Sequence, residues 1–287
     1  MPLAAAVPPY TAEWCERGYN NRAAVPEFQR WFDHWAALSR DVVARHRPRV
    51  DVRYGRGARE TLDLFLPAGR PRGTLVFIHG GYWRSLDKAD HAFVAPPFVA
   101  QGIAVANLNY ELCPSVSIAD IVAQAQRAIA FLQREGSRLG LPSAPLVVAG
   151  HSAGGHLAAM LLATPSDAFG TPAHPVRGGV SLSGVHDLEP LLLTSYNADL
   201  RLDAAQARAM SPVHLQPQCD APLLLAVGTG ETSEFLRQTD LLWDAWPAAR
   251  PRGMEGPLRV PGRHHFDVVV DYADPASALT RATLDLF

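Results

Sequence analysis

The sequence has little cysteine, no excess of either charge and no long apolar run, and each scarcity excludes a class of protein. Its three cysteines, Cys15, Cys113 and Cys219, are far apart and odd in number, which predicts neither a disulfide framework nor a paired metal site. Free thiols fit a reducing cytoplasm, where we expect the protein to reside. A formal net charge of -2 provides no basic field for nucleic acid or for an anionic membrane surface.

No segment approaches the roughly 20 apolar residues of a membrane-spanning helix. Met1 to Tyr10 also lacks the basic and apolar regions of a secretory signal, so we expect no leader and no membrane association. The expected partner is a small-molecule substrate, and a homodimer stays open. With 287 residues, of which 48% are hydrophobic, the chain has enough apolar material for one domain over residues 1–287.

Two kinds of strand pattern follow one another along the chain. Apolar and polar residues alternate at 50–54 and 62–66, which predicts two half-buried antiparallel strands. Nearly continuous apolar runs then recur at Thr74–Ile78, Ile103–Leu108, Pro145–Ala149, Gly179–Leu182 and Pro222–Val227. Because such runs fit strands buried on both faces, the sequence predicts an α/β fold: a mostly parallel sheet between helices, with antiparallel N-terminal strands.

Helical spacing of apolar residues predicts helices over 26–47, 118–132, 235–246 and 276–286. Ser117, with Asp120 three residues later, gives the second of these a capping box. Residues 1–47 are rich in aromatics and are expected to form a helical, lid-like segment. Residues 184–219 fit no strand–helix unit, and we expect either an insertion over the active site or an excursion that only packs.

The segment Gly150-His151-Ser152-Ala153-Gly154 lies between an apolar strand and a helical run. A serine in this GxSxG turn is exposed at the top of an α/β-hydrolase sheet, where it acts as a nucleophile. We therefore predict the α/β-hydrolase fold, with Ser152 as the nucleophile of a serine hydrolase. The spacing of His151 and His156 is not that of a helical metal pair, and no metal is expected.

His79-Gly80-Gly81-Tyr82-Trp83 follows the third strand, from which this fold supplies its oxyanion donors. Adjacent glycines let backbone N–H groups turn toward developing negative charge. We expect the amides of Gly81, Tyr82 and Ala153 to form the oxyanion hole.

The acid and the base follow the serine in chain order. Glu231, after the strand at 222–227, is the preferred acid; Asp187, after the strand at 179–182, is the alternative, and Glu234 is expected to face elsewhere. His265 is preferred to His264 as the base. In this arrangement His265 deprotonates Ser152 and Glu231 orients the imidazole, so no metal or organic cofactor is expected.

With these residues in place, the chain resembles the serine-hydrolase type of kynurenine formamidase (arylformamidase), a relative of the hormone-sensitive-lipase-like esterases. The resemblance spans nearly the whole chain. Its main motif is HGGYW at 79–83, which is similar to that family's HGGxW motif. The other segments that carry it are 150–154, 231–235, 265–267, 19–23 and 54–66.

The resemblance implies hydrolysis of N-formyl-L-kynurenine to formate and L-kynurenine, in tryptophan breakdown. It also implies a triad of Ser152, Glu231 and His265. The family pattern favours aspartate where this chain has Glu231, which leaves Asp187 open. A carboxylesterase for small acyl or aryl esters is the alternative activity. Trp83, beside the oxyanion motif, is a candidate for contact with substrate.

Overall fold

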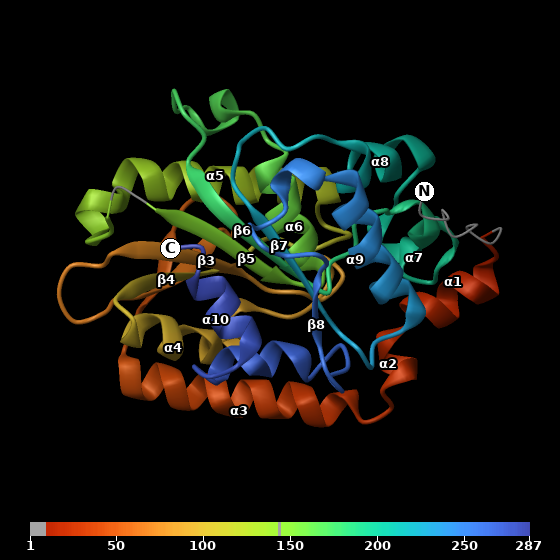
Figure 1. The fold of residues 1–287 in the computed structure, drawn as a ribbon, viewed down its shortest axis with the longest axis horizontal. Coiled ribbons are helices and arrows are strands. Elements are labelled where there is room, and N and C mark those ends of the chain that lie inside the picture. Colours follow the sequence, from red (N-terminus) through yellow and green to blue (C-terminus); the bar gives the residue numbers. More distant parts are fainter. Residues whose placement is uncertain (1–9, 143–144) are drawn as a thin grey trace.

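The structure is a computed structural model that describes residues 10–142 and 145–287 (Figure 1). Its centre is an eight-stranded sheet with strand order β1-β2-β4-β3-β5-β6-β7-β8. The strands are β1 Arg49–Arg53, β2 Thr61–Phe65, β3 Gly73–Ile78, β4 Ile103–Leu108, β5 Leu146–His151, β6 Val176–Leu182, β7 Leu223–Gly228 and β8 Leu258–Val260. Strands β3 to β8 pair in parallel, whereas β2 runs antiparallel to both β1 and β4. The mostly parallel sheet predicted from the sequence, with antiparallel N-terminal strands, is confirmed.

Helices cover both faces of this sheet. The α-helices are α1 Ala12–Tyr19, α2 Asn21–Ala24, α3 Phe28–His46, α4 Ala95–Ala100, α5 Ile118–Leu139, α6 Ala153–Leu162, α7 Asn197–Leu200, α8 Ala204–Ala209, α9 Ser233–Ala245 and α10 Ala278–Leu284. Short 3-10 helices are η1 Lys88–Asp90, η2 Ala92–Val94, η3 Ser166–Phe169, η4 Glu189–Leu193, η5 Pro212–His214, η6 Pro247–Ala249 and η7 Val268–Ala273. Figure 1 shows α3, α4 and α10 on one side of the sheet and α5 and α6 on the other.

The central strands are buried because both of their faces pack against helices. Along β2 to β7 every residue except Arg177 is buried. Successive side chains point to opposite faces, so on β3 Val76 packs in the core beneath α5 and α6, whereas Phe77 packs in the core beneath α3 and α4. This two-sided burial explains the continuous apolar runs in the sequence.

The long helix α5 shows how local sequence sets an element's limits. Ser117 Oγ accepts a hydrogen bond from the Asp120 amide at 3.1 Å, and Asp120 Oδ2 accepts one from the Ser117 amide at 2.9 Å. The helix ends at Gly140, whose φ of +82° suits glycine. The predicted capping box is confirmed, and the helix extends seven residues beyond the predicted end at Leu132, to Leu139.

Two segments outside the strand–helix units lie near the carboxyl edge of the sheet. In the N-terminal segment, α1 packs against η4 and α9, and α3 packs beside η1 and η2. The 184–219 segment folds into η4, α7, α8 and η5. The prediction that no leader occupies Met1 to Tyr10 concerns residues 1–9, which lie outside the described part of the chain. Within that part, no helix combines the length and the apolar character required to cross a membrane.

Candidate active site

Ser152 occupies a sharp turn between β5 and α6. Its backbone has φ 58° and ψ −118°, a left-handed conformation that costs energy for a residue with a side chain. The glycines on either side leave room for this turn. A Cβ on Gly150 would lie 2.1 Å from the Gly154 carbonyl oxygen, and one on Gly154 would lie 2.0 Å from that of Ile78. Both positions therefore require glycine.

The structure brings Ser152, His265 and Glu231 into one hydrogen-bonded row. Ser152 Oγ lies 3.1 Å from His265 Nε2, and His265 Nδ1 lies 2.7 Å from Glu231 Oε2. Since a carboxylate only accepts, Nδ1 carries the proton, and Nε2 is left to accept from the serine. This is the arrangement in which a histidine can remove a serine proton.

Two further donors bind the Glu231 carboxylate through the oxygen that does not contact His265. Its side chain is fully buried, and its Oε1 accepts hydrogen bonds from the Gly228 amide at 3.0 Å and from the Ser183 hydroxyl. A buried carboxylate is costly unless it is paired and hydrogen-bonded, and these contacts meet that requirement. They also fix Oε2 toward His265.

The other candidate residues lie elsewhere. Asp187 accepts hydrogen bonds from the Tyr10 hydroxyl at 3.2 Å and from the Glu189 amide at 3.1 Å. Its carboxylate therefore bonds to the N-terminal segment and to its own loop, and not to His265. His264 Nδ1 accepts hydrogen bonds from the backbone amides of Phe266 and Asp267. Glu234 forms an ion pair with Arg237. None of the three takes the place of Glu231 or His265 in the row.

The loop 79–83 lies directly against the nucleophile turn. A Cβ on Gly80 would meet the His151 carbonyl oxygen at 2.8 Å and Ser152 Cβ at 3.1 Å, so only glycine allows this approach. Gly81, Tyr82 and Trp83 all have positive φ, at 106°, 51° and 54°. Successive backbone amides in turn conformations of this kind form concavities that bind anions. Across the turn, Ala153 begins α6, and its amide has no partner within the helix.

His79 anchors this loop. Its Nδ1 lies 2.8 Å from the Gly80 carbonyl oxygen, and its ring stacks on Tyr110 with 4.3 Å between centroids. The Tyr110 hydroxyl donates to the His79 carbonyl oxygen at 2.9 Å. Burial lowers the pKa of His79 to about 4, so the imidazole is neutral near pH 7. His79 therefore positions the glycines and stays remote from proton transfer.

His151, inside the GxSxG turn, contacts His265 directly. Its Nε2 lies 2.9 Å from the His265 carbonyl oxygen, which accepts the hydrogen bond. Burial keeps the pKa of His151 well below its ordinary value, so the ring is neutral and donates through Nε2. The motif revealed the serine, but nothing in the sequence indicated that its neighbour would hold the histidine loop.

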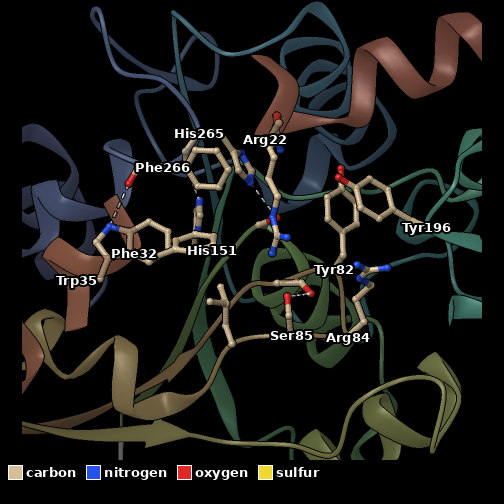
Figure 2. A pocket seen from close by; sticks show the side chains of 14 residues that line it. Arg22, Phe32, Trp35, Tyr82, Arg84, Ser85, His151, Tyr196, His265 and Phe266 are labelled. Atoms are coloured by element: carbon tan, nitrogen blue, oxygen red, sulfur yellow. Dashed lines mark hydrogen bonds between the residues drawn. The ribbon is translucent and has the colours of Figure 1, made fainter. Parts of the chain in front are cut away.

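Ser152 is among the residues that line a pocket with aromatic walls, which Figure 2 shows from close by. The cavity has a volume of about 40 Å³, and the hollow around it opens to solvent. One wall comes from α2 and α3 and the other from Tyr196, whose ring stacks on Tyr82 at 4.1 Å. Its lining residues are Asn21, Arg22, Phe32, Trp35, Gly81, Tyr82, Arg84, Ser85, Leu86, His151, Ser152, Tyr196, His265 and Phe266.

Trp83 is not part of this lining, which corrects its expected contact with substrate. The side chain is fully buried, and its ring meets that of His156 edge-on at 4.9 Å. His156 in turn bonds to the Met210 carbonyl oxygen at 2.7 Å. Over residues 10–142 and 145–287, no group of three or more histidine, cysteine or acidic side chains is placed to hold a metal ion.

Comparison with known proteins places this site in a family. A family model described as BD-FAE matches residues 62–178. The kynurenine formamidase of Salmo salar is 30% identical over 247 residues, which cover 83% of this chain and 81% of the salmon protein. That of Danio rerio is 29% identical over the same shares of the two chains. This chain belongs to the kynurenine formamidase family of the α/β-hydrolase superfamily.

A solved structure from Silicibacter sp. TM1040, classed provisionally as a thioesterase, superposes with a TM-score of 0.83 at 36% identity. The match covers 94% of this formamidase-family chain and 98% of the Silicibacter chain. It confirms the α/β-hydrolase fold predicted from the GxSxG turn. Together, the family and this neighbour establish the chain as a hydrolase.

Proposed function

We propose that the protein hydrolyses N-formyl-L-kynurenine to formate and L-kynurenine through a formyl-enzyme on Ser152. The observation that carries the proposal is the row from Ser152 to His265 to Glu231, at 3.1 and 2.7 Å, in a chain of this family. The aromatic pocket above Ser152 supports an aryl substrate, because flat rings pack well against aromatic walls.

The first half-reaction forms the acyl-enzyme. His265 Nε2 takes the hydroxyl proton as Ser152 Oγ bonds to the formyl carbon, and the carbonyl oxygen becomes an oxyanion. The amides of Gly81, Tyr82 and Ala153 donate to that oxygen. When the C–N bond breaks, the proton on His265 passes to the departing aryl amine, which leaves as L-kynurenine. Glu231 stabilises the imidazolium in the interval.

The second half-reaction frees the enzyme. A water molecule gives a proton to His265 and attacks the formyl ester on Ser152, and the same amides hold the second oxyanion. As the ester bond breaks, His265 returns the proton to Ser152 Oγ, and formic acid leaves and loses its proton to solvent as formate. No redox partner enters the balance.

Formate release tests this proposal. We expect wild-type protein to release formate and L-kynurenine in equal amounts from N-formyl-L-kynurenine, with a kcat/KM above that for p-nitrophenyl acetate. A rate on the formamide no higher than that of the Ser152→Ala variant would refute it.

Small esters or thioesters are the second candidate substrates. The Silicibacter structure, at 36% identity over 94% of this chain, carries a thioesterase description, and the same row of residues can attack any acyl carbon within reach. A kcat/KM for p-nitrophenyl acetate well above that for N-formyl-L-kynurenine would favour this candidate over the formamidase.

A further inference from the structure

The active-site pocket carries positive charge that its own residues do not balance. Two arginines, Arg22 and Arg84, line it, and no aspartate or glutamate from the described part of the chain does so. Its two histidines are part of the hydrogen-bonded site, and the remaining lining is aromatic, apolar or uncharged. Figure 2 shows Arg22 reaching from α2 toward the centre of the pocket.

The two arginines differ in their partners. Arg84 forms an ion pair with Asp199, and its guanidinium lies 5.4 Å from the centre of the Tyr196 ring. Arg22, by contrast, has neither an ion pair nor a side-chain hydrogen bond among residues 10–142 and 145–287. Its guanidinium lies 5.1 Å from the centre of the Phe28 ring and 5.6 Å from that of Phe32. These rings hold the cation in place and leave its N–H donors available.

The carboxylates near the pocket are already occupied. Glu16 accepts hydrogen bonds from the Ser195 amide and hydroxyl and from Asn20. Glu231 is bonded to His265. Neither forms an ion pair with Arg22, so the N–H donors of Arg22 at the pocket's rim are available to a ligand.

We infer that Arg22 binds the carboxylate of the substrate and thereby selects aryl formamides and aryl esters that carry a carboxylate on the aryl side, away from the scissile bond. The planar guanidinium presents paired donors that match the two carboxylate oxygens. With the acyl group at Ser152 and the aryl ring between the walls, a carboxylate would extend toward α2. This inference rests on the proposed function for its substrate and refines it by naming the residue that sets specificity.

Matched substrates separate charge recognition from chemistry. One pair is N-formyl-L-kynurenine and the neutral 2′-formamidoacetophenone, which keeps the aryl formamide and lacks the amino-acid group. The other is 4-(2-acetoxyphenyl)-4-oxobutanoate and 2′-acetoxyacetophenone, which are aryl acetates that differ in a carboxylate on the aryl side of the scissile bond. The variants are Arg22→Met and Arg22→Lys. Arg30→Met removes an exposed charge from α3 outside the pocket, and Arg84→Met removes the paired pocket arginine.

For Arg22→Met we expect kcat/KM on the carboxylate-bearing member of each pair to fall about five- to tenfold, mainly through KM, with the member lacking the carboxylate changed less than twofold. Arg22→Lys should recover part of the loss. The wild-type preference for the carboxylate-bearing member should shrink as NaCl is raised, because the site is exposed. Arg30→Met should match wild type, and Arg84→Met should affect both members equally.

Equal losses on the carboxylate-bearing and the neutral substrates in Arg22→Met would overturn the inference, as would a carboxylate-specific loss in Arg84→Met alone. The ester pair keeps the outcomes distinguishable. If the formamides are not hydrolysed but 4-(2-acetoxyphenyl)-4-oxobutanoate still depends on Arg22, the proposed formamidase activity fails and the carboxylate site stands.

Discussion

The Nδ1 atom of His265 lies 2.7 Å from Oε2 of Glu231, although Asp187 also follows a neighbouring strand of the sheet. We expect Glu231→Gln to lower kcat by about 10³- to 10⁴-fold, because an amide no longer fixes the tautomer or stabilises the imidazolium. Formate release under saturating substrate measures this effect.

Asp187→Asn is the matched control for that experiment. Among residues 10–142 and 145–287 its carboxyl bonds to Tyr10 and Glu189 and not to His265, so we expect kcat to stay within about threefold of wild type. A loss in Asp187→Asn as large as that in Glu231→Gln would contradict the assignment of the acid.

Replacing Ser152 by alanine should remove turnover on formamides and esters and leave the folded state intact, since only one buried hydroxyl is lost. A fluorophosphonate probe should label wild-type protein and fail to label Ser152→Ala. Ser85→Ala provides the comparison, because Ser85 lines the same pocket and its hydroxyl donates to the Gly81 carbonyl oxygen at 3.0 Å. Continued labelling of Ser152→Ala would place the nucleophile elsewhere.

Tyr110→Phe should impair catalysis without blocking binding. The Tyr110 hydroxyl donates to the carbonyl oxygens of His79 and Gly80, at 2.9 and 3.2 Å, and so fixes the loop that carries the oxyanion amides. Loss of a whole oxyanion donor lowers kcat by about 10²- to 10³-fold. Because Tyr110→Phe only loosens the loop, we expect a smaller fall in kcat of about tenfold, with KM nearly unchanged. Steady-state kinetics on one substrate measures both constants.

Tyr272→Phe controls for the loss of a buried hydroxyl as such. Tyr272 is equally buried, and its hydroxyl bonds to Thr283 outside the pocket. This variant should lose about 1 kcal/mol of stability while keeping its kcat. If the two variants lost kcat to the same degree, the anchoring role of Tyr110 would be excluded.

Acidification should destabilise the fold through its buried histidines. Burial lowers the pKa to about 4 for His79 and His156 and to about 3 for His91 and His186, from an ordinary value of 6.5. Between these pKa values and 6.5 the unfolded chain binds protons that the folded chain does not. The free energy of unfolding therefore falls as the pH is lowered from about 7 to about 4. Urea unfolding across this range measures the slope.

A pair of glutamine variants isolates the contribution of one histidine. His156→Gln keeps a donor for the Met210 carbonyl oxygen but no longer titrates, so the slope should become shallower by one proton. His34→Gln makes the same exchange at an exposed histidine of α3 and controls for the substitution itself. Identical slopes in all three proteins would show that the buried histidines do not govern acid stability.

The sequence predicted those parts of the site that depend on short segments. Ser152 and the glycines around it were predictable because a strand, a turn and a helix meet there within a few residues. His265 was predictable from its place after the last strand. The choice between Glu231 and Asp187 was not fixed, because β6 and β7 are neighbours and both end at the same edge of the sheet.

The pocket wall was beyond prediction for a different reason. Arg22 and Tyr196 are far apart in the chain, and each reaches the site only through the path of a segment outside the sheet. No local pattern encodes such a path. Trp83 shows the opposite error: a position within a motif suggested substrate contact, yet the left-handed backbone at Tyr82 and Trp83 turns its ring into the core.

The order of the active residues along the chain has a consequence for synthesis. Ser152 and His265 are 113 residues apart, and the base comes last. At typical rates of translation, roughly 6–23 s pass between the two. During that time the base of the proposed mechanism is absent, so that mechanism predicts no acylation of Ser152 in a nascent or truncated chain. On this proposal, reactivity begins only when the carboxyl-terminal part of the chain has been made.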